Sequence, residues 1–186
     1  MVARERYYTL EEFYEFISLP ENEGKLFEWE DGVIVNLGLS SVLKSVTSGR
    51  IIYFLNVLVI PQNLGYVTAI SGGFELKAIR RVRRPDAAFI SKSHGVTLEG
   101  VDFTVAPDLA VEVASPDEDV LKKAKEYIRS GTRIVWVVYV DEKVVNVITP
   151  ASNGEYRVQE FTVDETLDGG DVLPGFKLAV RDIFPD

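Results

Sequence analysis

The chain contains no cysteine and only one histidine, His94, among its 186 residues. The absence of cysteine excludes disulfides, thiolate zinc sites, iron–sulfur clusters and cysteine nucleophiles. A single histidine cannot supply a metal site that needs two histidine ligands, and a Ser-His-Asp triad would depend on His94 alone. Any chemistry of this protein must therefore rest on carboxylates, lysines, hydroxyl groups and backbone groups.

Positive charge is also in deficit, because 20 Lys and Arg residues stand against 29 Asp and Glu residues, a formal net charge of −9. An acidic chain is repelled by phosphate backbones at long range, so a nucleic-acid partner requires a local basic patch. The opening segment has no apolar signal core, and the longest apolar stretch, residues 51–60, is too short to span a bilayer. The sequence therefore predicts a soluble, cytoplasmic protein with no membrane partner.

Local patterns predict a mixture of helices and strands within one domain. Capping signals and the helical spacing of apolar residues predict helices over residues 10–19, from Ser40 or Ser41 to about residue 60, and over residues 115–130. Pro61 is expected to stop the second helix, and Ser115 and Gly131 to cap the third. Alternating patterns predict a hairpin over residues 25–37 and strands over residues 65–78, 86–90, 109–114, 134–140, 144–148 and 156–163. A bulge is expected at Gly72-Gly73. The simplest fold is a single α/β domain with helices packed on a mixed sheet.

Three carboxylates, Glu28, Asp86 and Glu112, occupy strand positions where carboxylates are unusual. Burying an ionised carboxylate costs several kcal/mol unless it is paired or binds a metal. Asp108 lies on the same face as Glu112 but about 13 Å along the strand, so the two cannot share one ion. Asp86, from a neighbouring strand, is the natural partner of Glu112, whereas Asp108 orders the strand entry. A buried Arg or Lys partner, or a strand with one solvated face, is the structural alternative.

Basic residues follow the same candidates along the chain. On the helix expected over residues 115–130, Lys123 borders the apolar face beside Tyr127, while Lys122 and Lys125 turn towards solvent. Lys123 can thus present its ammonium near the end of the Glu112 strand, although an ordinary lysine at the rim of the helix is the alternative.

A dense basic run stands directly before Pro85-Asp86, and it comprises Arg80, Arg81, Arg83 and Arg84. In an acidic chain these arginines are candidates for phosphate contacts. A solvated hairpin tip is the alternative interpretation of the run.

Five short motifs appear in a recognisable order: Glu28 before Asp31-Gly32, Arg84-Pro85-Asp86, Pro107-Asp108 before Glu112, Lys123 before Tyr127, and Leu173-Pro174-Gly175-Phe176. Together they resemble the Uma2 family of restriction endonucleases, which is common in cyanobacteria and has the PD-(D/E)XK nuclease fold. The resemblance extends from about residue 10 to residue 184. It implies a single restriction-endonuclease-like domain over residues 1–186, with a mixed sheet flanked by helices.

The resemblance also implies a metal-dependent endonuclease. By the family pattern Asp86 and Glu112 are metal ligands, and Glu28 is an acid contributed from the N-terminal part. The usual motif lysine falls at Ala114 in this sequence, so Lys123 is the matching catalytic lysine. Mg²⁺ suits such carboxylate ligands, and Mn²⁺ can replace it.

Lys44 stands where the family often has histidine, which puts an accessory contact in doubt. The implied partner is nucleic acid, in particular DNA. Two alternatives remain, an inactive nucleic-acid- or protein-binding module and a hydrolase of small nucleotides. A homodimer is also expected, through Tyr7, Tyr8, the segment 173–176 and Phe184-Pro185.

Overall fold

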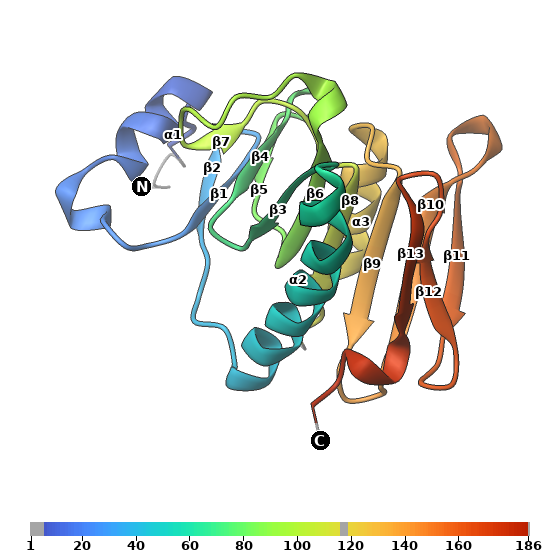
Figure 1. Cartoon of the computed structure of the whole chain (residues 1–186). Helices are drawn as coiled ribbons and strands as arrows, with labels where there is room; N and C mark the ends of the chain where they lie inside the picture. Colours follow the sequence, from blue (N-terminus) through green and yellow to red (C-terminus); the bar gives the residue numbers. More distant parts are fainter. Residues whose placement is uncertain (1–5, 116–118, 186) are drawn as a thin grey trace.

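Two β-sheets and a separate hairpin carry the fold in residues 6–115 and 119–185, which the computed structural model describes (Figure 1). One sheet has the strand order β2-β1-β5-β4-β7, and the other has the order β11-β10-β9-β8-β6-β3. Strands β12 and β13 pair with each other. Residues 27–103 supply the strands of the first sheet, and the C-terminal half supplies four of the six strands of the second.

The five-stranded sheet begins with the expected hairpin of β1 (Phe27–Glu30) and β2 (Val33–Asn36). Asp31 and Gly32 at its tip both have positive φ angles, which fits the turn that this dipeptide favours. Helix α1 (Leu10–Ile17) begins at the predicted capping box of Thr9 and Glu12 and packs on this sheet through its buried face.

The remaining strands of this sheet correct one prediction. Residues 65–78 do not form a single bulged strand, because β3 (Gly65–Ala69) belongs to the six-stranded sheet and β4 (Gly73–Leu76) to the five-stranded sheet. A side chain on Gly73 would collide with the Asp102 carboxylate, so glycine allows the chain to pass here between the sheets. Strands β5 (Arg81–Arg83) and β7 (Asp102–Phe103) complete the sheet, and neither was predicted.

The six-stranded sheet is mixed, as expected. It contains β3, β6 (Ala87–Ser91), β8 (Leu109–Val113), β9 (Ile134–Tyr139), β10 (Val144–Pro150) and β11 (Tyr156–Phe161). Strands β8 and β9 are parallel, and helix α3 (Val120–Arg129) provides the crossover between them. The other strand pairs of this sheet are antiparallel.

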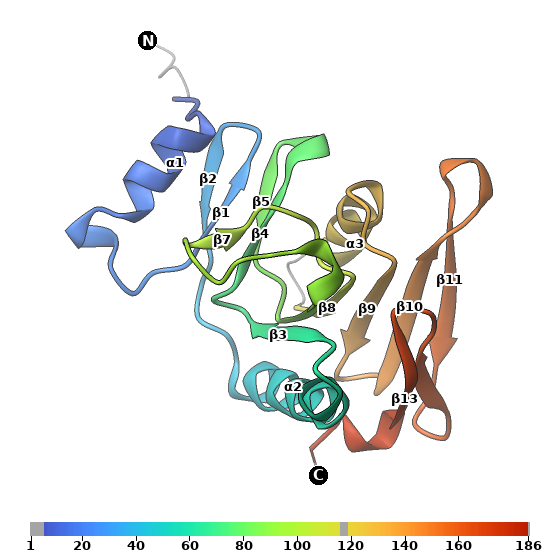
Figure 2. The same cartoon turned by 45° about the horizontal axis from the view of Figure 1, so that its top comes forward.

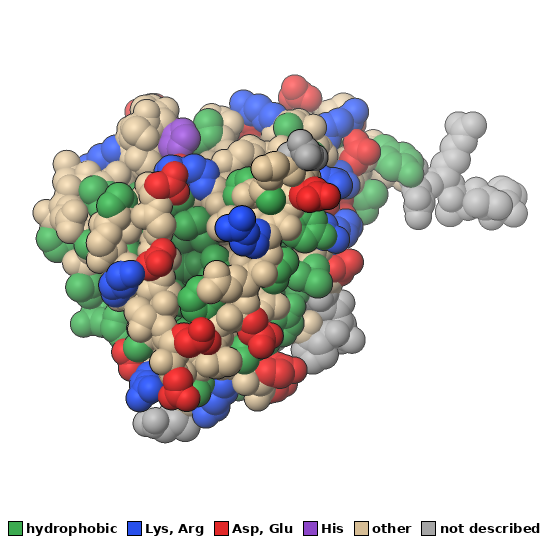
Figure 3. Space-filling view, turned by 90° about the vertical axis from the view of Figure 1, so that its right-hand side faces the viewer, with side chains coloured by type: hydrophobic (Ala, Val, Ile, Leu, Met, Phe, Trp, Pro, Cys, Tyr) green, Lys and Arg blue, Asp and Glu red, His purple; other side chains and the backbone are tan. Residues whose placement is uncertain are grey.

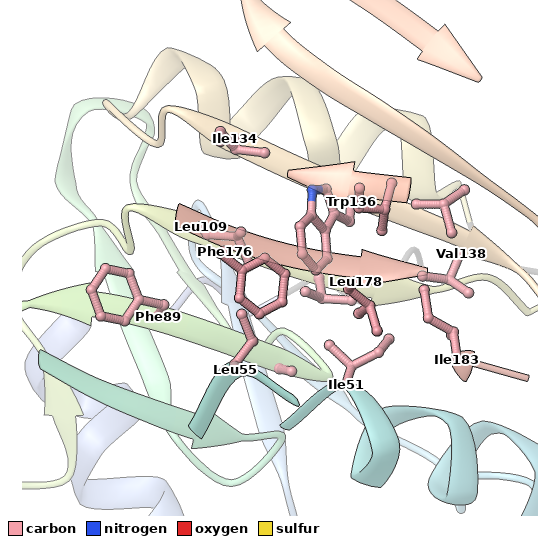
Figure 4. Packing of buried hydrophobic residues seen from close by; sticks show 14 of the residues in the cluster. Ile51, Leu55, Phe89, Leu109, Ile134, Trp136, Val138, Phe176, Leu178 and Ile183 are labelled. Atoms are coloured by element: carbon pink, nitrogen blue, oxygen red, sulfur yellow. The ribbon is translucent and has the colours of Figure 1, made fainter. Parts of the chain in front are cut away.

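The two faces of this sheet bury different elements (Figure 2). Helix α2 (Val42–Gln62) and the hairpin of β12 (Thr166–Gly169) and β13 (Leu173–Ala179) cover one face. Figure 4 shows Ile51 and Leu55 of α2 facing the same cluster as Phe176 and Leu178 of β13. Helix α3 and strand β4 pack on the other face.

Both central helices depart from their predicted ends. Pro61 does not stop α2, which runs on to Gln62 and ends where Asn63 takes the left-handed conformation. Pro61 has no N–H to donate to the carbonyl oxygen of Val57, so the last turn loses one backbone hydrogen bond and the helix ends one residue later. Helix α3 begins at Val120 with Asp119 as its cap, so Ser115 is not the cap, and residues 116–118 of the predicted start lie outside the described residues.

The surface predicted for self-association is wrong in its main part. Leu173 and Phe176 of β13, together with Phe184, are buried in the core that the β12–β13 hairpin forms with the six-stranded sheet. Their apolar character stabilises this chain internally and leaves them unavailable to a partner. Tyr7 is exposed, and Tyr8 is half-buried.

Helix α2 is longer than the apolar stretch in the sequence indicated. Its 21 residues are long and apolar enough to cross a membrane by length and composition. Ile51, Leu55 and Val59 of this helix, however, are buried against the six-stranded sheet. The helix is therefore part of the core of this domain.

Candidate active site

The candidate site lies where the chain crosses from one sheet to the other. Strand β5 ends at Arg83, and β6 begins at Ala87, so Asp86 stands at the entry to the six-stranded sheet. Strand β6 pairs antiparallel with β8, with Ala87 opposite Val111. Continued by one residue, this register places Asp86 opposite Glu112, where Cβ atoms of paired residues are about 4.5–5.5 Å apart. The adjacency of these two acids, predicted from strand order, agrees with this register.

Asp86 is buried and is contacted from two directions. Its Oδ2 accepts a hydrogen bond from the backbone N–H of Val113 at 2.7 Å. The same oxygen lies 3.0 Å from Nζ of Lys44, which comes from the first turn of α2. The backbone bond fixes the carboxylate against β8, and the lysine places a positive charge beside it.

Glu112 is buried in the middle of the sheet, and only 1% of its surface is exposed. Its Oε1 accepts a hydrogen bond from the Tyr127 hydroxyl at 2.9 Å. Burial and the nearby charge of Glu112 raise the pKa of Tyr127 well above its usual value, so the phenol remains a donor. Tyr127 is on the buried face of α3, as its helical position predicts.

The three lysines of α3 differ as the helical wheel predicted. Nζ of Lys123 lies 3.3 Å from Oε1 of Glu28, and this side chain is mostly buried. Lys122 instead reaches Glu30 from a half-exposed position, and Lys125 lies over the ring of Tyr156. Lys123 is thus the lysine of the three that contacts one of the candidate acids.

Glu28 belongs to a network of ion pairs beside the Asp86–Glu112 pair. Its Oε2 is 2.7 Å from NH1 of Arg83, and its Oε1 accepts a hydrogen bond from the backbone N–H of Arg84 at 2.9 Å. Lys123 contacts the same Oε1. Both carboxylate oxygens of Glu28 therefore already have cationic or N–H partners.

Arg83 is the centre of this network and is completely buried. Its guanidinium contacts Glu28, Glu30 and Glu126 at 2.6–2.7 Å. Burial works to lower the pKa of Arg83, but the three carboxylates outweigh it and raise that pKa. Burial likewise works to raise the pKa of Glu30, but Arg83, assisted by Lys122, lowers it to about 2.

The basic run is not a solvated hairpin tip, because two of its members are internal. Arg84 donates to the carbonyl oxygens of Phe27 and Ser71 and pairs with Asp102 at 2.9 Å. Arg83 and Arg84 thereby join β1, β7, α3 and the turn before β4, and a phosphate contact by either would require these bonds to break. Arg81 pairs with Glu126, and the exposed Arg80 pairs with Asp31.

Asp108 has the separate role that its distance from Glu112 indicated. It accepts a hydrogen bond from the backbone N–H of Ser91 at 2.8 Å and pairs with Arg133. His94 contacts the same carboxylate at 3.1 Å. Asp108 therefore orders the entry to β8 and the loop after β6.

The donor set suits a hard divalent cation at Asp86 and Glu112. Mg²⁺ binds through one or two carboxylates and keeps several of its waters. Within residues 6–115 and 119–185 there is no group of three or more His, Cys, Asp or Glu side chains arranged to hold a metal. That Glu28 joins Asp86 and Glu112 as a third ligand stays a prediction, and in this structure Glu28 contacts Arg83, Arg84 and Lys123.

Lys44 is the site residue whose role the family pattern does not indicate. The pattern makes it an accessory departure, yet it contacts Asp86 directly. One signal was available: Lys44 and Arg50 are the charged residues in a 21-residue helix of otherwise uncharged side chains. An isolated charge in such a helix indicates a partner inside the molecule.

Paired acids on adjacent strands of a mixed sheet, with lysines from flanking helices, define a restriction-endonuclease-like α/β domain. A crystal structure from Anabaena variabilis, described as a "putative nuclease belonging to DUF820", matches with a TM-score of 0.79 and 24% identity, covering 95% of this chain and 97% of that one. The chain belongs to the Uma2 family, described as "Putative restriction endonuclease", whose model matches residues 10–181. No curated protein matches it.

Proposed function

We propose that this protein is a magnesium-dependent endonuclease that hydrolyses phosphodiester bonds in DNA. The observation that carries the proposal is the register that sets Asp86 opposite Glu112 at the junction of the two sheets. Both acids are buried. Two buried carboxylates at adjacent positions repel each other, so a divalent cation between them offsets a cost that the fold otherwise has to bear.

In this proposal Asp86 and Glu112 are the metal ligands. A divalent ion bound there, Mg²⁺ or Mn²⁺, supplies positive charge to the phosphate and lowers the pKa of water. The Val113 N–H aims one oxygen of Asp86, and the Tyr127 hydroxyl holds one oxygen of Glu112. Fixed ligand orientation of this kind is what neighbouring hydrogen bonds contribute to metal sites.

Lys123 is the proposed catalytic lysine. Its ammonium orients the attacking water or offsets the negative charge that develops on the phosphate. Glu28 is then a positioning residue, because it contacts Lys123 and is itself held by Arg83. This chain of contacts fixes a flexible lysine side chain at the edge of the site.

The substrate must approach a protein of net charge −9. Figure 3 shows acidic and basic side chains interspersed over the face at the β11 end of the molecule. Two exposed cations lie on the elements that carry the candidate site: Lys122 on α3, beside Lys123, and Arg80 directly before β5. We assign the initial phosphate contacts to these two residues, in preference to the buried Arg83 and Arg84.

Cleavage of supercoiled plasmid DNA tests the proposal. We expect nicking that requires Mg²⁺ or Mn²⁺ and is lost in Asp86→Asn, which keeps the side-chain shape but removes the charge. Asp171→Asn, an exposed acid, is the matched control and should cleave normally. Calorimetric titration with Mg²⁺ should detect one ion bound by the wild type and none by Asp86→Asn. A wild type that neither binds the ion nor cleaves DNA would refute the proposal.

The lysine assignment has its own test. Methionine keeps the apolar stem of lysine and removes its charge, so Lys123→Met should lose cleavage by about 10²–10⁴-fold. Lys125→Met, whose ammonium lies over the ring of Tyr156, should stay near wild-type activity. Lys122→Met should raise KM through its lost phosphate contact and leave kcat unchanged, and all three variants should unfold at similar temperatures. Equal activity of the three would leave Lys123 as an ordinary lysine at the helix rim.

The acidic charge favours a second candidate, a hydrolase of small nucleotides. A small substrate is repelled less by a protein of net charge −9 than a long phosphate backbone is. Turnover of a nucleotide panel without plasmid cleavage would select this candidate. DNA binding without turnover of either substrate would instead select a binding module on the same fold.

A further inference from the structure

Helix α2 presents an uncharged stripe on the side that faces away from the core. Its apolar members are well exposed, from 42% for Val46 to 82% for Val42. The open backbone position of Gly49 lies among them, since no atom would contact a side chain there. Successive members are three or four residues apart and therefore share one side of the helix. We call this set the α2 stripe, and it consists of Val42, Val46, Gly49, Tyr53, Val57 and Ile60.

The charged residues of α2 are both directed elsewhere. Lys44 pairs with Asp86 inside the molecule, and Arg50 donates to the carbonyl oxygen of Phe184 at 2.6 Å. The α2 stripe is therefore uncharged from Val42 to Ile60, a length of about 27 Å along the helix. Its side chains expose on the order of 500 Å² of surface, which is at the upper end for apolar patches on monomers.

The order of residues in the α2 stripe is nearly the same from either end. In an antiparallel pair of α2 helices, Val42 of one copy comes opposite Ile60 of the other. Val46 then comes opposite Val57. At the centre the glycine, Gly49, comes opposite the largest side chain, Tyr53. A small residue opposite a large one is the arrangement that allows two helices to pack closely.

A hollow beside the centre of the α2 stripe has room for that tyrosine. Its volume is about 730 Å³, and besides Gly49, Phe54 and Phe184 it is lined by the charged side chains of Arg50, Arg181 and Asp182. A ring entering from an antiparallel second copy would reach this hollow next to Gly49. The same contact would recur on the other side of a two-fold axis.

We propose that the α2 stripe is a homodimer interface, in which two α2 helices pack antiparallel about a two-fold axis between Gly49 and Tyr53. The second copy is favoured as occupant because the stripe is complementary to itself and carries no charge that would repel an identical surface. The stripe's exposed area, on the order of 500 Å², is more than half of the roughly 800 Å² per partner that stable dimers bury. The interface is independent of the proposed nuclease activity.

Light scattering across a concentration series is the first test. The wild type should have the mass of a dimer, and Val57→Glu should be monomeric because it places a charge at the interface. Val158→Glu is the matched control: Val158 is also an exposed valine, but it lies on β11, and this variant should remain dimeric. A monomeric wild type, or a dimer that persists in Val57→Glu, would overturn the proposal.

Cross-linking tests the antiparallel register, and the absence of native cysteine makes every introduced thiol unique. A mixture of Val46→Cys and Val57→Cys should form a heterodimer with a short bis-maleimide. Each variant alone should not, because identical positions would be about 16 Å apart along the helices. Self-linking of Val46→Cys would indicate parallel helices and overturn the register.

A lipid surface is the competing occupant of an apolar helix face. Flotation with vesicles of phosphatidylcholine and phosphatidylglycerol separates the two cases. If the stripe is a dimer interface, the protein should remain at the bottom of the gradient, apart from the floating vesicles. A wild type that is monomeric in solution and floats with the vesicles would assign the α2 stripe to a membrane and overturn the dimer.

Discussion

Buried carboxylates close to the sheet junction have two different kinds of partner. In the arginine network, the guanidinium of Arg83 contacts Glu28, Glu30 and Glu126 at once. In the neighbouring pair, Asp86 has the ammonium of Lys44, and Glu112 has the hydroxyl of Tyr127. The first group connects strands and a helix, whereas the second brings two acids to one place.

The difference lies in the chemistry of the partners. A guanidinium has five donors in a rigid plane and can bridge several carboxylates with fixed geometry. An ammonium is a compact charge on a flexible stem, so it can move aside when an ion takes its place. The network is therefore suited to holding the fold, and the Asp86–Glu112 pair is suited to exchanging partners during a reaction.

Arg83→Met should give the largest effect on stability. It leaves Glu28 and Glu126 buried without their main cation, which typically costs about 3–5 kcal/mol in the free energy of unfolding. Urea denaturation measures this loss, with the exposed Arg80→Met as control, for which a change below about 0.5 kcal/mol is expected. A loss of less than about 1 kcal/mol in Arg83→Met would show that the network does not hold the junction.

Lys44→Met should have an intermediate effect, and it should change the affinity for Mg²⁺ instead of the stability of the fold. Removing the ammonium beside Asp86 takes away a competitor for the divalent ion, so the dissociation constant for Mg²⁺ should fall about two- to fivefold. Calorimetric titration measures the affinity, and Lys92→Met serves as control because Lys92 lies outside the site. Weaker binding in Lys44→Met would mean that this lysine assembles the site and does not compete for it.

Glu30→Gln should give the smallest effect, and it should depend on pH. The folded-state pKa of Glu30 is about 2, below its usual value, so its ion pairs stabilise the fold above the unfolded pKa of about 4.5. That contribution is lost as the pH falls from about 4.5 to about 2. Urea midpoints of the wild type and Glu30→Gln should therefore differ at pH 6 and converge near pH 2, and a constant difference would contradict this account.

The sequence predicted the elements that have strong local patterns. The three helices, the β1–β2 hairpin and the buried strands β8 and β9 follow from capping residues, a turn dipeptide and continuous apolar runs. Strands β5 and β7 are only two or three residues long, and β13 contains Pro174 and Gly175, which are unusual inside strands. Those strands are formed by pairing with distant segments, which local patterns do not reveal.

The candidate site likewise contains residues whose positions the sequence predicts and residues whose positions it does not predict. The adjacency of Asp86 and Glu112 could be predicted because each acid interrupts an apolar strand, and the inward position of Lys123 follows from helix geometry. The ion pair of Glu28 with Arg83 could not be predicted, because it depends on how the chain brings β1 and β5 together. The basic run is locally indistinguishable from an exposed turn, and only the packing of β1, β4 and α3 around it decides its burial.

The position of the β12–β13 hairpin has a consequence for synthesis of the protein in the cell. Leu173, Phe176 and Leu178 cover Trp136 and its neighbours on the six-stranded sheet, and they are translated after every strand of that sheet. Until then that face of the sheet is exposed to water and to other nascent chains, a condition that promotes aggregation. This face of the core can therefore close only after β13 has been synthesised, and a chain truncated before residue 173 should be a substrate for chaperones and proteases.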